Sequence, residues 1–201
     1  MTALNVKKQT PKNWDERMER LVDPVSLAII ERLKAAGQGT HIRFTAMYAI
    51  LHPALKAAVL EARGRGAEVD MFTNHQLVAP PITTMAWLAG IQDTAEFVTA
   101  GVRVHAFRRN PRNPWTFMHL KVMVVDDTVF YGSHNFNLPS SVANDELHYQ
   151  VVDTELAAQA AALFDGYVSA NSELITAESA ASEKPLGPLA RWILTPLMGF
   201  Y

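Results

Sequence analysis

The 201-residue chain carries two recurring patterns of hydrophobic and polar positions. Short apolar runs rich in β-branched and aromatic residues predict strands at residues 41–47, 68–73, 102–107, 120–125, 129–131 and 146–152. Stretches in which apolar residues recur with the period of a helix predict helices at 53–63, 83–99 and 154–170, after a first helix that begins at Pro24 and stops at Gly37. Because helices and strands alternate along the chain, the pattern predicts an α/β domain.

Two of these helices begin with residues that favour helix starts. Asp23 precedes Pro24, which combines a capping carboxylate with a proline at the first helical position. Thr154 is expected to cap the last helix, with Glu155 in its first turn, where the helix dipole favours a negative charge. No internal repeat is evident in the sequence.

One short region concentrates the polar groups that indicate chemistry. His119 and Lys121 lie two residues apart at the start of an expected strand, so alternation places both side chains on the same side. After a turn at Asp126, the returning strand leads to Ser133 and Asn135. Their hydroxyl and amide are neutral hydrogen-bonding groups suited to phosphoryl oxygens.

Three further positions bear on whether this region binds and attacks a phosphoryl group. Gly132 lets the backbone come close to a ligand. Glu146 is placed to accept a proton from one imidazole nitrogen of His119, which fixes the tautomer and leaves the other nitrogen free to attack. His119 is therefore a candidate nucleophile. His134 turns to the opposite face by strand alternation, so we expect it to be a buried structural residue.

These residues resemble the His-Lys-Asp signature of the phospholipase D superfamily, in which a histidine, a lysine and an aspartate precede a Gly-Ser-x-Asn segment and a glutamate. The order of elements from about 23 to 153 resembles the second half of a bacterial cardiolipin synthase-like phospholipase D. Its helix-strand unit corresponds to Pro53 through Val69, and its following strand to Ala100 through Val104. The resemblance implies a sandwich with a central mixed β-sheet flanked by helices, with 23–172 as a single catalytic half-domain.

The resemblance places Asp126 among the catalytic residues, together with His119, Lys121 and Glu146. Five residues separate Asp126 from Gly132, one fewer than in the family pattern, and we interpret this as a tighter hairpin. The position of Asp126 at the end of a strand suits a residue that stabilises the turn or forms a salt bridge better than it suits a second base.

The phospholipase D active site contains two such motifs, and this chain has one. Six other histidines lack a lysine two residues later: His41, His52, His75, His105, His134 and His148. A single half-site supplies a nucleophile but not the partner histidine that protonates the leaving alkoxide. Either two copies form a homodimer around a shared site, or the chain is the C-terminal half of a longer protein with two motifs.

Three functions are open: reaction with a phospholipid, reaction with a nucleic acid, or no turnover without a separate first half. The expected tail, 173–201, is apolar near its end, with Trp192, Phe200 and Tyr201. It resembles the hydrophobic end of cardiolipin synthase-like enzymes, which favours phosphatidyl transfer or phospholipase action at a membrane interface. Packing of this tail on the domain or on a partner is an equally good interpretation.

A nuclease of the same superfamily is the alternative. It is favoured by the lone motif and by Arg108, Arg109 and Arg112, although a solvated charged loop also explains these arginines. Trp115 and Phe117 could line a pocket, but aromatic residues near a strand start more often belong to the core. A third possibility is a catalytically silent module that needs a separate first half.

Composition sets the remaining bounds. A formal charge of −2 gives no global sign of nucleic-acid binding. The absence of cysteine excludes disulfides and thiolate metal sites, and Lys121 would place a positive charge against a metal ion, so we expect no metal or other cofactor. The first residues, treated as the 1–22 extension, lack a signal-peptide core, and no run is long enough to span a bilayer. We expect a cytoplasmic protein, or one peripheral at the inner membrane.

Overall fold

The computed structural model describes residues 1–7, 22–74, 90–91, 93–107 and 118–182. The strands are β1 (Thr2–Val6), β2 (His41–Ala46), β3 (Glu68–Thr73), β4 (Arg103–Phe107), β5 (Val122–Val125), β6 (Thr128–Gly132), β7 (Glu146–Val152) and β8 (Ser172–Leu174). The helices are α2 (Pro24–Lys34), α3 (Pro53–Gly64), α5 (Leu138–Val142), α6 (Thr154–Leu163) and α7 (Ala177–Ser182), with a π-helical turn η1 (Phe164–Val168) after α6.

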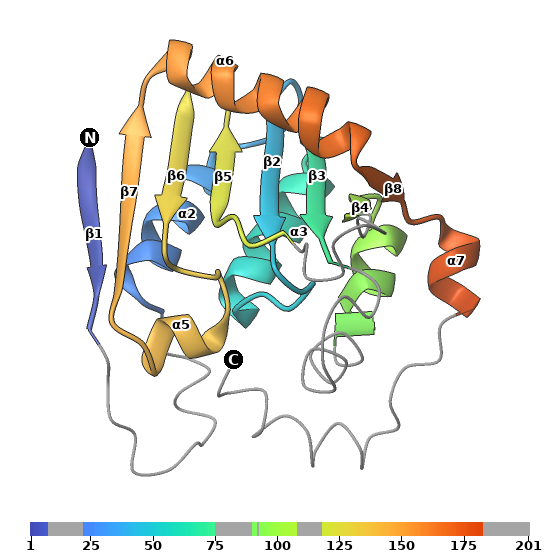
Figure 1. Cartoon of the computed structure of the whole chain (residues 1–201), viewed down its shortest axis with the longest axis horizontal. Coiled ribbons are helices and arrows are strands. Elements are labelled where there is room, and N and C mark those ends of the chain that lie inside the picture. The colour runs from blue at the N-terminus through green and yellow to red at the C-terminus, as the bar shows by residue number, and fades with distance from the viewer. Residues whose placement is uncertain (8–21, 75–89, 92, 108–117, 183–201) are drawn as a thin grey trace, which may run out of the picture.

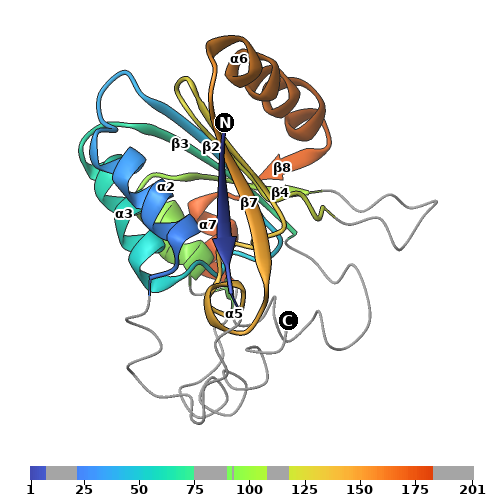
Figure 2. The ribbon, with the colours of Figure 1, turned by 90° about the vertical axis from the view of Figure 1, so that its left-hand side faces the viewer.

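All eight strands form one sheet, in the order β1-β7-β6-β5-β2-β3-β4-β8. The strands β2, β3 and β4 are parallel neighbours, and the other pairs are antiparallel. Helices α2 and α3 cover one face of the sheet and α6 crosses the other, which is clearest when the sheet is seen from its β1 edge (Figures 1 and 2). The expected α/β fold with a central mixed sheet flanked by helices is confirmed.

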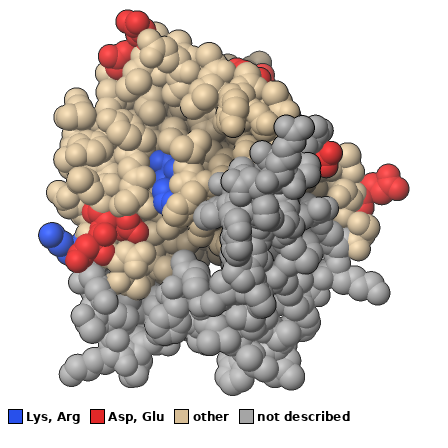
Figure 3. Space-filling view, viewed as in Figure 1, with Lys and Arg blue, Asp and Glu red and all other residues tan. Residues whose placement is uncertain are grey.

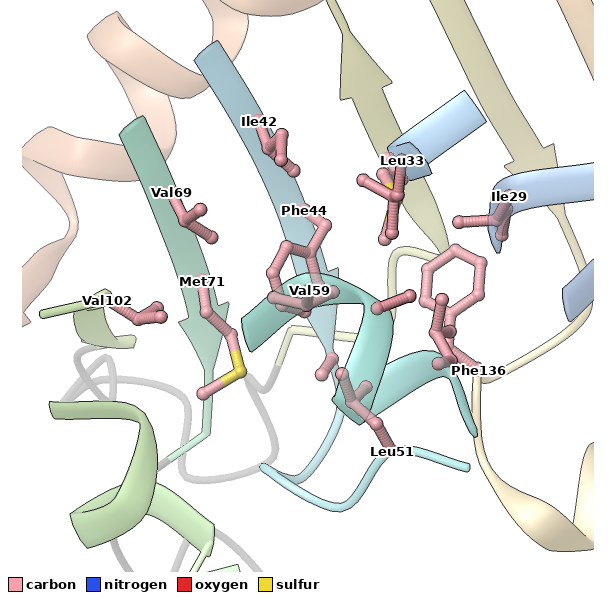
Figure 4. Close-up of a cluster of buried hydrophobic side chains, with 14 of the residues drawn as sticks. Ile29, Leu33, Ile42, Phe44, Leu51, Val59, Val69, Met71, Val102 and Phe136 are labelled. Carbon is pink, nitrogen blue, oxygen red and sulfur yellow. The ribbon is translucent and has the colours of Figure 1, made fainter. Parts of the chain in front are cut away.

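The main core lies between the sheet and the pair α2 and α3. Phe44 and Met71 project from neighbouring parallel strands towards Leu33 of α2 and Val59 of α3, and all four are fully buried (Figure 4). A smaller cluster beneath α6 contains Val124, Val129 and Phe164. Because both faces of the central strands are buried, these strands have near-continuous apolar sequences.

Several element boundaries differ from the sequence prediction. The strand expected at 120–125 begins only at Val122. The helix expected at 154–170 becomes π-helical at Phe164, and its cap is Asp153, whose side chain accepts a hydrogen bond from Leu156 N, so the assignment of Thr154 as the cap was wrong. Of the helix expected at 83–99, the structure describes helical residues at 90–91 and 93–99.

Two short edge strands were not predicted. Strand β1 lies in the expected N-terminal extension and pairs with β7, while β8 begins at the expected end of the domain and pairs with β4. Ile175 and Ala180, within the expected tail, are buried in the main core. The sheet and its core therefore extend beyond 23–172 on both sides.

Candidate functional site

The motif residues meet at one edge of the sheet because of the strand directions. Strands β5 and β6 are antiparallel, as are β6 and β7, so the start of β5, the end of β6 and the start of β7 lie side by side (Figure 1). Lys121 precedes β5, Gly132 ends β6 and Glu146 begins β7. The backbone N–H of Gly132 donates to the carbonyl of Lys121 at 3.2 Å, which joins the two motif segments directly.

His119 and Lys121 lie before β5, in a segment without regular strand structure. The Lys121 ammonium donates to the backbone carbonyl of His119 at 2.9 Å. Burial lowers the pKa of Lys121 to about 8, and the Glu146 carboxylate partly offsets this shift. Partial desolvation and the Lys121 charge both lower the pKa of His119. The neutral imidazole is therefore favoured near neutral pH.

Glu146 is buried at the start of β7 and binds two neutral side chains. The Ser133 hydroxyl donates a short hydrogen bond to Glu146 Oε2, and the Asn144 amide donates to Oε1 at 3.2 Å. The Leu147 N–H in turn donates to Ser133 Oγ at 3.1 Å. Ser133 is thus fixed beside the carboxylate, and orientation of the His119 imidazole by Glu146 stays a prediction.

Gly132 allows a close approach between β6 and β7. A Cβ atom at this position would lie 2.3 Å from the Leu147 carbonyl oxygen and 2.7 Å from His148 Cα. No other residue type fits this space without moving the strands apart. The glycine therefore permits the spacing that places Ser133 beside Glu146.

Asn135 is held by the short helix that follows the motif. Its backbone N–H and its side-chain amide both approach Ser140 Oγ, at 3.1 and 3.4 Å. Its side-chain Oδ1 is buried without a hydrogen-bond partner among the described residues. The next residue, Phe136, has a φ of 60°, which a bulky side chain adopts only when its surroundings require it.

Two residues that the motif does not contain hold the segment around His119. The Asn74 side chain binds both the N–H and the carbonyl of Met118, at 2.8 Å each. The Thr45 hydroxyl donates to the Leu120 carbonyl at 2.8 Å and accepts from the Val122 N–H at 3.1 Å. Thr45 lies near the end of β2 and Asn74 directly after β3. A polar residue at the end of a buried parallel strand is the only signal in the sequence that could have identified them.

Asp126 lies at the other end of β5 from the site. The four residues of β5 lie between it and Lys121, so the two Cα atoms are about 16 Å apart at about 3.3 Å per residue. Its carboxylate lies 3.7 Å from the Arg32 guanidinium, and the Thr40 hydroxyl donates to it at 3.3 Å. The contacts of Asp126 are those of a turn residue, and a catalytic role for it stays a prediction from the resemblance.

The hairpin between β5 and β6 is as tight as the shortened spacing predicted. Val125 pairs with Thr128, which leaves a loop of only Asp126 and Asp127. Asp126 has a φ of 52°, a left-handed conformation that aspartate tolerates in turns. The short loop thus absorbs the missing residue, and Ser133 still reaches Glu146.

Other predicted features lie outside the described residues. These are Arg108, Arg109, Arg112, Trp115, Phe117 and the apolar segment from Pro185 onwards. Within the part of the chain that the structure describes, no group of three or more histidine, aspartate or glutamate side chains is arranged to hold a metal ion. None of the helices in this part has both the length and the apolar composition needed to span a bilayer.

The sequence of this chain matches a known protein family. A family model described as cardiolipin synthase, PLD-like domain, matches residues 29–168 and so includes every motif residue from His119 to Glu146. The chain belongs to the phospholipase D superfamily. This superfamily comprises phosphodiesterases and transferases that act on phosphodiester bonds. A search of curated protein sequences found no match.

Solved structures share the fold at low sequence identity. Nuc from Salmonella typhimurium, a phospholipase D family member, aligns with a TM-score of 0.59 at 18% identity, covering 87% of this chain and 98% of Nuc. NucT from Helicobacter pylori aligns with a TM-score of 0.57 at 18% identity, covering 78% of this chain and 92% of NucT. Phosphatidylserine synthase from Haemophilus influenzae Rd KW20 aligns with a TM-score of 0.54 at 18% identity, covering 71% of this chain but 34% of that enzyme.

Proposed function

We propose that the chain is a phospholipase D-type phosphodiesterase or phosphatidyltransferase that acts on phospholipids through a phosphohistidine. The observation that carries this proposal is the meeting of Lys121, Ser133 and Glu146 beside His119 at one edge of the sheet. A cation, a neutral donor and a nucleophile in one place suit a phosphodiester.

In the proposed reaction, a nitrogen of His119 forms a bond to phosphorus as the bond from phosphorus to the leaving oxygen breaks. A second histidine, supplied from outside this half-site, gives its proton to the leaving alkoxide. That histidine then takes a proton from an incoming alcohol or water, whose oxygen displaces His119 from phosphorus. An alcohol gives phosphatidyl transfer, and water gives hydrolysis.

Lys121, Ser133 and Asn135 are proposed to hold the non-bridging oxygens in both steps. The Lys121 ammonium supplies the positive charge that stabilises the developing negative charge on these oxygens. The single O–H of Ser133 is donated to Glu146 in the substrate-free protein, so it is proposed to turn to a phosphoryl oxygen when substrate binds. The negative charge of Glu146 favours the protonated form of Lys121.

The second histidine is proposed to come from another copy of the chain or from a separate motif-bearing half. The other described histidines are committed elsewhere: His41 and His105 bind Asp70, and the remaining three, His52, His134 and His148, are fully buried. A symmetric dimer is the commonest way for identical chains to share such a site. If a separate half is needed, the isolated chain is a silent module that binds but does not turn over.

The phospholipid substrate is supported by the matching family model, whose description names cardiolipin synthase, and by the apolar C-terminal sequence. On the face that carries α6, lysine and arginine occupy little of the described surface (Figure 3). A nuclease remains the second candidate, supported by Arg108, Arg109 and Arg112 in the sequence and by the coverage of nearly all of Nuc.

The test compares wild type, His119→Ala and the control His41→Ala on three substrates. These are bis(p-nitrophenyl) phosphate, phosphatidylglycerol vesicles and single-stranded DNA. We expect wild type and His41→Ala to release phosphatidyl products and His119→Ala to be inactive. Cleavage of DNA alone, falling steeply with salt, would replace the lipid proposal with the nuclease. Activity in His119→Ala would refute both.

A further inference from the structure

Asp23 connects the helix α2 to residues 133–143, here called the motif loop, through the two oxygens of one buried carboxylate. Oδ1 caps α2 by accepting hydrogen bonds from the N–H groups of Val25 at 2.8 Å and Ser26 at 3.0 Å. Oδ2 accepts from the hydroxyl of Ser26 at 2.6 Å and from that of Ser141 on α5 at 2.7 Å. The sequence predicts only the capping role, because the contact with Ser141 joins residues far apart in the chain.

His134 is the second residue of this segment, after Ser141, that contacts Oδ2 of Asp23. Its Nε2 lies 3.4 Å from Asp23 Oδ2, and both side chains are almost completely buried. Its Nδ1 accepts a hydrogen bond from the Phe136 N–H at 2.9 Å, so the ring proton sits on Nε2, facing the carboxylate. Burial alone would raise the pKa of Asp23, but the His134 Nε2–H that faces the carboxylate and the hydrogen bonds from Ser26 outweigh burial and hold this pKa well below its usual range.

The residues that contact Asp23 alternate with those of the proposed phosphate site. His134 lies between Ser133 and Asn135, and Ser141 follows Ser140, which binds Asn135. A displacement of His134 therefore moves Ser133 and Asn135 through the backbone, and a displacement of Ser141 moves Asn135 through Ser140 and its hydrogen bonds. Burial of a charged carboxylate makes this link costly to break.

We propose that Asp23 is a positioning residue, which holds Ser133 and Asn135 in register for the phosphoryl oxygens by binding His134 and Ser141. This inference rests on the proposed function. It predicts that the link between α2 and the motif loop affects substrate turnover as well as stability.

Ser141→Ala and Ser26→Ala form a matched pair that tests this. Each removes one buried hydroxyl from the same oxygen of Asp23, but only Ser141 lies in the motif loop; its hydroxyl also lies 3.1 Å from the Asn137 carbonyl. Replacing Asp23 itself would remove the helix cap and confuse the two roles. The readouts are unfolding by urea, kcat and KM for bis(p-nitrophenyl) phosphate, and amide hydrogen exchange of residues 133–143.

We expect both variants to lose comparable stability, and Ser141→Ala alone to lose about tenfold in kcat/KM with faster exchange at Ser133 and Asn135. Equal kcat/KM in the two variants, or unchanged exchange in the motif loop, would overturn the positioning role. If wild type hydrolyses no diester, either a separate half is needed or the proposed function fails. The exchange measurement then decides on its own whether the link orders Ser133 and Asn135, and unchanged exchange would again overturn it.

Discussion

The pKa values of His119 and Lys121 fall for related reasons. Both side chains lose solvent at the sheet edge, and the Lys121 charge further disfavours protonation of His119. The lowered pKa of His119 favours the neutral imidazole that the proposed attack requires. The lowered pKa of Lys121, to about 8, limits the range in which its charge is available.

We therefore expect a bell-shaped dependence of kcat/KM on pH. The rate should rise as pH increases through the lowered pKa of His119, which makes the imidazole neutral. It should fall as the second histidine loses the proton that it gives to the leaving group, and further above about 8 as Lys121 loses its proton. Measurement between about pH 4 and pH 10 reports these groups in the free enzyme. A rate that stays constant through the alkaline range would show that the Lys121 charge is not needed.

Gly132→Ala tests the close approach between β6 and β7. The added Cβ would overlap the Leu147 carbonyl and the His148 backbone. We expect the free energy of unfolding to fall by about 1–3 kcal/mol, with loss of activity as Ser133 moves from Glu146. Gly64→Ala is the control, because nothing lies within 4 Å of its added Cβ and the position ends a helix. If the two variants unfolded at the same urea concentration, the steric argument would be wrong.

The spacing of the motif predicts that its side chains lie at one edge of the sheet, but it gives no information on how each is held. Glu146, expected to bind the His119 imidazole, accepts a hydrogen bond from Ser133. Asp126 does not join them, because a short turn places it at the far end of β5. His134 was correctly expected to be buried. Its contact with Asp23 could not be predicted, since pairing between distant segments leaves no local pattern in the sequence.

The segment before β5, which contains His119 and Lys121, is held in place by neighbouring strands. His119 and Lys121 were expected to face one side because of strand alternation, but the strand begins one residue later than Lys121. Their positions depend instead on hydrogen bonds from Thr45 at the end of β2 and Asn74 just after β3. The parallel strands therefore fix the loop that bears the nucleophile.

Asn74→Ala should loosen this loop. The substitution removes both hydrogen bonds to the Met118 backbone and the one to the Met47 carbonyl, in a buried position. We expect a loss of about 1–3 kcal/mol in the free energy of unfolding and a larger proportional loss in kcat than in substrate affinity. Thr99→Ala is the control, because its hydroxyl binds only the Ala95 carbonyl on an exposed helix surface. Unchanged kcat in Asn74→Ala would show that the loop needs no support from β3.

The long central elements were the most predictable. Strands β3 and β7 have the bounds that their apolar patterns predicted. The edge strands β1 and β8 were missed because each is short and gains its stability from pairing with a neighbour. The helix α5 was missed for a similar reason: it has only five residues, too few for a helical period to be visible.

The sheet as a whole encloses a histidine that couples folding to pH. His148 is fully buried on β7, and neither ring nitrogen has a hydrogen-bond partner within the described residues. Burial is the main cause that lowers its pKa to about 3, with a smaller contribution from the neighbouring His134. Below the ordinary histidine pKa of 6.5 the unfolded chain binds a proton that the folded protein does not.

Stability should therefore fall as pH decreases from about 6.5 towards about 3, by up to about 1.4 kcal/mol per pH unit from this group. His148→Met removes the titrating ring and should flatten this part of the curve, with little loss at neutral pH because no hydrogen bond to a described residue is broken. Urea unfolding at several pH values measures the slope. His41→Gln, which alters a partly exposed ring outside the core, should leave it steep; an unchanged slope in His148→Met would assign the effect to other groups.

The proposed chemistry depends on a covalent bond between phosphorus and His119. The most direct test is to mix the protein with a phosphodiester, quench it in alkali, where phosphohistidine is stable, and locate any adduct by mass spectrometry of peptides. We expect a phosphoryl adduct on the peptide that contains His119 in wild type and none in His119→Ala. Turnover by wild type with no adduct on His119, or an adduct on another residue, would contradict the role of His119 as nucleophile.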